Sequence, residues 1–303
     1  MKKNFLLTLL LALCTSLQCW AEFNPTPGKM YALKEVTSGL YLDIQTLGIK
    51  DRERNTNNIS LNANPRIIYF ENGSTSGTWK LKNINGKYVY HVTPNNDGHW
   101  NPEIKDTPSD WTITESAGKI TIARSDKKYI NVDTKEAGQP LYCDKDTGME
   151  FSLVELYAAL KSPTGTYLNF TPVSNGSDNT TQVSFRQHPS YLYIHSTSEG
   201  ITFEDKSNSG RYIGISSSKN WNVDFGIAYW TISTPDTNGY VTISQKSDSS
   251  KNLGHDQNTN DGTGIFANVG SGVNKWIIEL HTIPTLMIRT LELLKITDNT
   301  CKS

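Results

Sequence analysis

Short stretches in which apolar and polar residues alternate recur along the whole chain. In Trp79–Leu81, Trp111–Ile113 and Trp230–Ile232, an aromatic residue is followed two positions later by an aliphatic one. A period of two is typical of β-strands that bury one face. Gly, Asn, Asp and Ser gather between these stretches, where turns are needed. The pattern therefore predicts an all-β chain made of many short strands.

A larger unit of about 40 residues recurs six times, and repeats of this length mark repeated architectures. Each unit has an alternating stretch, a polar turn and then an aliphatic residue, usually preceded by Tyr. These aliphatic markers are Leu42, Val89, Ile130, Leu168, Ile213 and Leu253, with spacings of 47, 41, 38, 45 and 40 residues. The third and sixth units end in similar strands, Phe151–Leu156 and Trp276–Leu280. The units therefore group into two domains of three.

A repeat of this length also suits the blade of a β-propeller. Six blades would close into a single ring, which leaves the grouping into threes and the break near Tyr157 unexplained. Two three-unit domains remain the preferred interpretation.

The element Gly39–Asp43, with the sequence Gly-Leu-Tyr-Leu-Asp, and the repeated aromatic-x-aliphatic closures resemble ricin B-type β-trefoil lectins over residues 28–281. The resemblance implies two tandem β-trefoil domains, 22–156 and 157–281. The chain departs from the family in its closing Gln-x-Trp motif. The positions two before the closing aromatics are Gly77, Ser109, Met149, Ala228 and Asn274.

In this family a sugar is held by an Asp just after the second strand of a unit, an aromatic ring on the third strand and polar partners nearby. Aromatic rings pack against the apolar face of a pyranose, and a carboxylate accepts hydrogen bonds from its hydroxyls. Asp43 matches that Asp, with Tyr69, Phe70 and Asn72 as the partners in its unit. The resemblance thus implies a leading site in the first unit. Asp43 as an ordinary turn residue is the alternative.

Two further units offer weaker candidate sites. The third has Asn131 at the Asp position, with Asp133 and Tyr142 near it, and the fourth has Asn169 and Phe185. The remaining units place Tyr90, Gly214 and Gly254 at the Asp position, so they are expected to be least able to bind.

The N-terminus reads as an export signal. Lys2 and Lys3 precede the apolar run Phe5–Leu13, and small Ala21 follows at a cleavage position. Cleavage there would leave 282 residues, with 27 basic side chains against 30 acidic ones. The apolar run is too short for a transmembrane helix, and no later stretch would make one. The chain is therefore expected in the periplasm, on the cell surface or outside the cell, as in exported bacterial proteins.

Several kinds of chemistry find no support in the sequence. The near-neutral charge disfavours nucleic acid as a partner. The six His show no zinc-binding spacing, and no nucleophile elbow or phosphate loop occurs. No metal, cofactor or catalytic residue is therefore expected. Cys143 is expected to be a buried thiol.

We accordingly predict a carbohydrate-binding protein that recognises glycans without catalysis. The alternatives are a protein-binding β-trefoil, with contact loops at 48–65 and 94–108, and the binding portion of a larger glycoside hydrolase or protease. Residues 282–303 form a C-terminal tail in which Thr285–Lys295 has the apolar spacing of a short helix. That helix could pack on the second domain, begin a further domain, or belong to a frayed tail.

Overall fold

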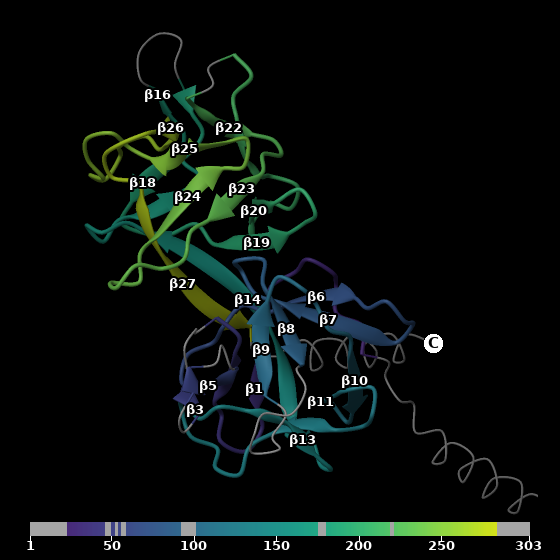
Figure 1. Cartoon of the computed structure of the whole chain (residues 1–303). Helices are drawn as coiled ribbons and strands as arrows, with labels where there is room; N and C mark the ends of the chain where they lie inside the picture. The colour runs from purple at the N-terminus through teal and green to yellow at the C-terminus, as the bar shows by residue number, and fades with distance from the viewer. Residues whose placement is uncertain are drawn as a thin grey trace, which may run out of the picture.

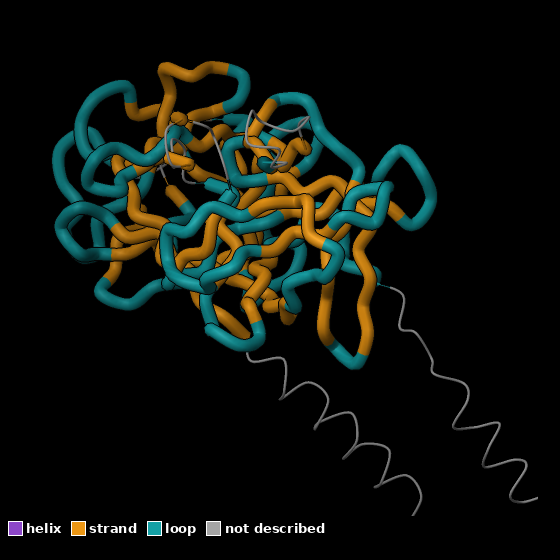
Figure 2. Tube along the Cα trace, turned by 60° about the horizontal axis from the view of Figure 1, so that its bottom comes forward, coloured by secondary structure: helices purple, strands orange, loops and turns teal. Residues whose placement is uncertain are grey.

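The computed structural model describes residues 23–45, 50–51, 54–55, 59–91, 101–174, 180–218 and 221–283. Every regular element in these ranges is a β-strand (Figure 2), which confirms the all-β expectation. In the same ranges there is no helix with the length and hydropathy to cross a bilayer. The predicted export signal, 1–21, and the predicted helix, 285–295, lie outside the described residues.

Six antiparallel strands form a closed ring in the first half of the chain. They are β1 (Tyr31–Glu35), β6 (Tyr69–Asn72), β7 (Thr78–Lys82), β10 (Trp111–Ser116), β11 (Lys119–Ala123) and β14 (Phe151–Lys161). Ladders join β6 to β7, β7 to β10, β10 to β11, β11 to β14 and β14 to β1. The two backbone hydrogen bonds between Tyr31 and Ile68 close the ring.

Three hairpins extend from this ring, one in each sequence unit. They pair β2 (Tyr41–Asp43) with β5 (Ser60–Asn62), β8 (Tyr88–His91) with β9 (Pro102–Lys105), and β12 (Tyr129–Asn131) with β13 (Tyr142–Lys145). A small ladder of β3 (Lys50–Asp51) and β4 (Arg54–Asn55) lies in the connection from β2 to β5.

The second half repeats this arrangement. Its ring consists of β14, β19 (Leu192–Ser196), β20 (Ile201–Asp205), β23 (Trp230–Ile232), β24 (Val241–Gln245) and β27 (Lys275–Ile283). Its hairpins pair β15 (Tyr167–Asn169) with β18 (Ser184–Arg186), β21 (Ile213–Ile215) with β22 (Val223–Phe225), and β25 (Asp248–Gly254) with β26 (Phe266–Val269). β16 (Val173–Ser174) and β17 (Thr180–Thr181) form a small additional ladder.

The residues that mark the repeats form the core. All six aliphatic markers are fully buried, and so are Trp111, Trp230 and Trp276. Trp79 is buried as well, so all four closing tryptophans are core residues. Cys143 is a buried free thiol, as expected, and its burial raises its pKa to about 12.

Two lobes share the long strand β14 (Figure 1), whose first residues pair with β1 and whose last residues pair with β27. One apolar cluster comes from residues 23–153, and the other comes mainly from residues 154–276. Tyr69 of the first lobe belongs to the second cluster, and its hydroxyl donates to the carbonyl oxygen of Ile194 at 3.0 Å. The lobes are therefore packed against each other and are not connected by a linker alone.

Candidate functional site

The predicted leading site is folded into the interior. Asp43 ends β2, and its carboxylate is fully buried. Its oxygens accept hydrogen bonds from the backbone N–H of Gln45 and the side chains of Asn62 and Arg66. These bonds tie the end of β2 to the loop before β6. The structure thus gives Asp43 the turn-stabilising role that the sequence left open as the alternative.

The aromatic partners expected for Asp43 show no ring face to solvent. Tyr69 and Phe70 alternate along β6, so one enters the second apolar cluster and the other the first. Both are 0% exposed, and a ring without an exposed face cannot stack on a sugar. Asn72 is exposed, but it lines a separate hollow beside Trp79. The first unit therefore does not bring these residues together as a surface site.

The third-unit candidates do lie together. Asn131 and Tyr142 face each other across the β12–β13 ladder, and both are partly exposed. Asp133 is 84% exposed and forms an ion pair with Lys145 at 3.0 Å. The Asn131 amide donates to the carbonyl oxygen of Thr147, which holds it in place.

The fourth-unit candidates separate. Asn169 is partly exposed, and its amide donates to the carbonyl oxygen of His188. Phe185 is fully buried and stacks on Trp276, with ring centroids 5.5 Å apart. Phe185 is therefore part of the core, which corrects its expected role as a stacking platform.

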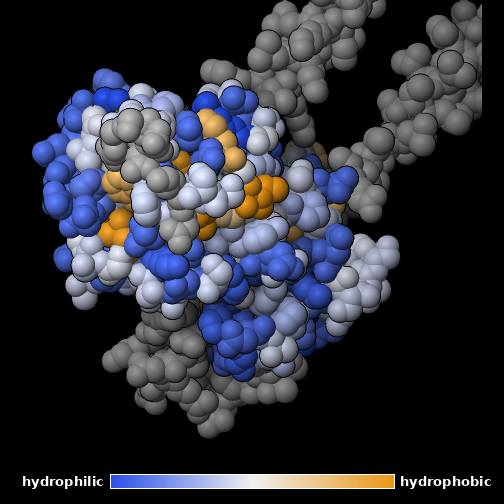
Figure 3. Space-filling model, turned by 90° about the horizontal axis from the view of Figure 1, so that it is seen from above, coloured by the Kyte–Doolittle hydropathy of each residue, from blue (hydrophilic) through white to orange (hydrophobic). Residues whose placement is uncertain are grey.

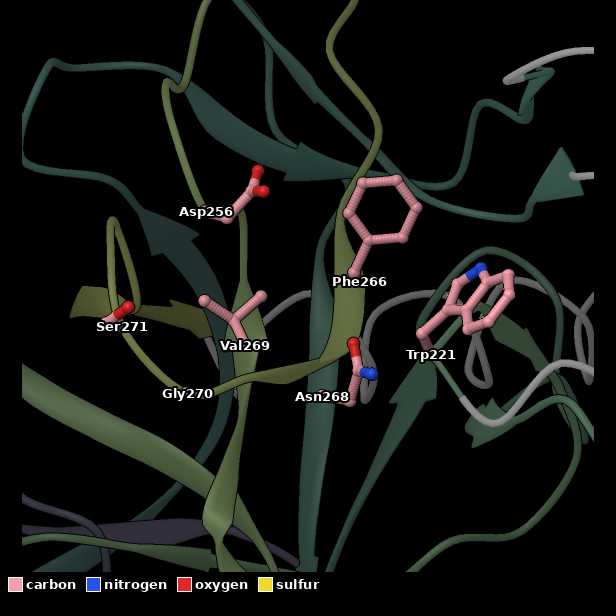
Figure 4. A pocket seen from close by; sticks show the side chains of 7 residues that line it. All are labelled: Trp221, Asp256, Phe266, Asn268, Val269, Gly270 and Ser271. Carbon is pink, nitrogen blue, oxygen red and sulfur yellow. The ribbon is translucent and has the colours of Figure 1, made fainter.

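An open pocket of about 490 Å³ lies instead on the β25–β26 hairpin of the sixth unit. It is lined by Trp221, Asp256, Phe266, Asn268, Val269, Gly270 and Ser271. In the view of Figure 4 the Phe266 ring lies between the Asp256 carboxylate and the Trp221 indole, with Asn268 below it. Two aromatic rings, a carboxylate, an amide and a hydroxyl thus converge on one hollow.

Backbone pairing between two units fixes the rings in this pocket. Trp221 precedes β22 in the fifth unit, and Phe266 begins β26 in the sixth. Asn222 and Phe266 form an antiparallel bridge, and the N–H of Ala267 donates to the carbonyl oxygen of Trp221 at 2.7 Å. The indole is 38% exposed, so part of its surface is available for stacking.

Asp256 is positioned by the close approach of the loop 270–273 to its backbone. His255 exchanges two backbone hydrogen bonds with Val273, which sets the loop 270–273 against Asp256. Gly272 has a φ of +116°, and a Cβ there would lie 2.5 Å from the carbonyl oxygen of Asp256. Only glycine fits this contact. The Asp256 side chain itself is 68% exposed and can accept hydrogen bonds from a ligand.

The sequence predicted that this unit would be among those least able to bind. The expectation rested on Gly254 at the family's Asp position, whereas Asp256 follows two residues later. A Cβ at Gly254 would lie 2.4 Å from the carbonyl oxygen of Val273, so this position serves packing. The sequence did contain one signal for a site in this unit, namely Phe266 and Asn268 on its third strand. It contained no signal that Trp221, from another unit, would join them.

Comparisons with known proteins identify no family. No family model matches the chain, and no curated protein does. Among solved structures, a mosquitocidal holotoxin matches with a TM-score of 0.36 and 13% identity, over 85% of this chain and 35% of the toxin chain. Lysenin in complex with phosphocholine matches with a TM-score of 0.32 and 14% identity, over 85% of this chain and 97% of lysenin. The chain thus spans about a third of the holotoxin chain.

Proposed function

We propose that this chain is an exported glycan-binding protein whose principal sugar site is the Trp221 pocket. The observation that carries the proposal is the joining of the Trp221 and Phe266 rings with the Asp256 carboxylate and the Asn268 amide in one open pocket. A pyranose has an apolar face for the rings and hydroxyls for the carboxylate and amide. The proposed action is recognition, without turnover of the glycan.

The proposal includes an architecture of two tandem β-trefoils of the ricin B type. Each lobe has a closed ring of six strands and three hairpins, one for each sequence unit. This threefold arrangement supports a trefoil. Phe266 lies on β26, where the resemblance implies an aromatic ring, and Asp256 lies two residues beyond the position where it implies an Asp. We take this pairing as support for a ricin-type binding unit.

Binding at such an open pocket is expected to be weak for a single sugar. Tight small-molecule sites enclose most of their ligand, and this pocket leaves one side to solvent. The third unit, with Asn131, Asp133 and Tyr142, is proposed as a second and weaker site. A branched or clustered glycan that engages both sites would gain affinity through effective concentration.

A glycan array probed with the full chain tests the proposal, followed by titration of the strongest glycan. Trp221→Ala and Asp256→Asn are each expected to weaken binding about tenfold or more, equivalent to about 1.4 kcal/mol. Both side chains are exposed, so neither change should alter the thermal midpoint by more than a few degrees.

Two matched variants control for surface effects. Phe225→Ala removes another exposed ring, which is 40% exposed, and Asp133→Asn removes another exposed carboxylate. The first should leave the affinity unchanged, and the second should affect only the weaker site. Binding that survives both pocket variants would place the sugar elsewhere. An array without signals from a folded protein would reject glycan recognition.

A row of apolar side chains favours a second candidate, a protein-binding surface. Phe225, Ile227 and Tyr229 occupy alternate positions and are all exposed, and Ile227 is 65% exposed. Figure 3 shows apolar side chains gathered at a few places on an otherwise polar face of the molecule. Capture of one defined protein partner, lost in Ile227→Asp and indifferent to free sugars, would support this candidate. Of the contact loops expected from the sequence, 48–65 and 94–108, residues 50–51, 54–55, 59–65 and 101–108 are described, and the others lie outside the described residues.

A further inference from the structure

A second hollow, of about 380 Å³, lies where the two lobes meet. The first lobe contributes Gln45, Arg66, Ile67, Ile84 and Asn85, and the second contributes Ile232, Ser233, Pro235, Gly239, Val241, Ile278 and Leu280. A smaller hollow of about 240 Å³ shares Ile84, Asn85 and Ile232 with it. The two hollows therefore lie next to each other along the junction, and together they are called the groove.

The groove differs chemically from the Trp221 pocket. The walls of the larger hollow are branched aliphatic side chains, among them Ile67, Ile232 and Val241, and no aromatic residue belongs to its described lining. Aliphatic walls offer no ring for a pyranose to stack on, but they bury a hydrocarbon chain favourably. The volume lies within the range of roughly 300–1,000 Å³ found for small-molecule sites.

Positive charge lies at both parts of the groove. Arg66 lines the larger hollow, and Lys246 lines the smaller one together with Lys82, which forms an ion pair with Glu71 at 2.8 Å. Among the described residues that line either hollow, none is acidic. A groove with cationic groups and apolar walls is complementary to an amphipathic anion.

The Arg66 side chain is held in place by a buried carboxylate. Its Nε donates to the buried carboxylate of Asp43 at 3.2 Å, and its side chain remains 33% exposed. The guanidinium carries further N–H groups beyond Nε, and these can pair with a carboxylate.

The geometry points to a ligand site at the lobe junction for a small aliphatic carboxylate. Arg66 binds the carboxylate of the ligand, and the Ile and Leu side chains surround its hydrocarbon part. This site is distinct from the Trp221 pocket in position, in charge and in the class of ligand. A ligand here touches both lobes, so binding is expected to stabilise their packing.

Isothermal titration of the full chain with decanoate, below its micelle concentration, tests the site, with decan-1-ol as the neutral ligand of equal length. Saturable 1:1 binding of decanoate, at least about tenfold tighter than decanol, is expected from a charge-assisted hydrogen bond. Arg66→Gln should remove that preference. Ile84→Glu, which places a carboxylate in the shared wall, should abolish binding without touching Asp43.

Arg186→Gln is the matched control, because Arg186 is 32% exposed and pairs with Asp261 away from the groove. It should leave decanoate binding unchanged, as should Trp221→Ala. No binding to the unaltered chain, or equal binding of decanoate and decanol, would overturn the proposal. Decanoate binding that persists in Ile84→Glu would overturn the location of the site. None of these outcomes would bear on glycan binding at the Trp221 pocket.

Discussion

The indole Nε1 of Trp276 donates a hydrogen bond of 2.9 Å to the carbonyl oxygen of Leu253. Leu253 is the aliphatic marker of the sixth unit, and Trp276 is its closing aromatic. The same bond joins Trp111 to Val89 and Trp230 to Ile213. In these three units the aliphatic marker and the closing Trp are thus joined by one buried hydrogen bond, which ties the hairpin of the unit to its closing strand.

Loss of this bond should destabilise the second lobe. Trp276→Phe leaves the buried Leu253 carbonyl without its donor and opens space in the core. We expect a decrease of about 2–4 kcal/mol in the free energy of unfolding, measured by urea denaturation. Trp221→Phe, at an exposed indole, should change it by less than about 0.5 kcal/mol. Equal effects of the two substitutions would contradict the assignment of Trp276 to the core.

Asp43 is expected to matter for stability more than for binding. Asp43→Ala removes the acceptor of three hydrogen bonds and leaves the Arg66 guanidinium without its buried partner. We expect a loss of about 2–4 kcal/mol in unfolding free energy, with glycan affinity at the Trp221 pocket unchanged when measured well below the melting temperature. A folded variant that loses all glycan binding would restore Asp43 as a site residue.

Gly272 provides a test of how the pocket is positioned. In Gly272→Ala the added Cβ would clash with the carbonyl oxygen of Asp256, and the alanine would have to adopt a positive φ that it normally avoids. We expect glycan affinity to decrease several-fold as Asp256 shifts. Gly138→Ala is the control, because its φ is also positive, at +82°, but its Cβ would meet nothing within 4 Å. A similar loss of affinity in both variants would point to general strain.

Glu35 should make stability depend on pH in the acid range. Burial by itself would raise the pKa of Glu35, but hydrogen bonds from Lys135 and Ser38 outweigh it and hold the pKa below its ordinary value. A lowered pKa means that this stabilisation is present above the pKa of the unfolded chain and disappears as pH falls through that of the folded chain. Glu35→Gln should therefore flatten the fall in unfolding free energy on acidification. An unchanged acid limb would contradict the prediction.

Cys143 should be inert in the folded protein. Burial raises its pKa to about 12, so almost none of it is thiolate at neutral pH, and thiolate is the reactive form. In a variant with every other cysteine replaced by serine, a thiol reagent should label Cys143 only at the rate of unfolding. Fast labelling under native conditions would show that the β12–β13 hairpin opens locally.

The sequence by itself determined the all-β class and the residues that form the core. The aliphatic markers and the closing tryptophans are buried, whereas the recurring Tyr residues that precede the markers are only half-buried. Alternation with period two reports burial because one face of each strand must leave water. It could not distinguish a ring that faces solvent from one that enters the neighbouring lobe, which is why Tyr69 and Phe70 were expected at the surface.

Only the tertiary structure decided where a ligand could lie. Trp221 and Phe266 are 45 positions apart and belong to different units, and a backbone bridge makes them neighbours. The groove at the lobe junction likewise combines Arg66 and Ile84 with Ile232 and Leu280 from the other lobe. A repeat pattern records what each unit buries within itself, whereas a pocket depends on how the backbones of different units and lobes approach one another.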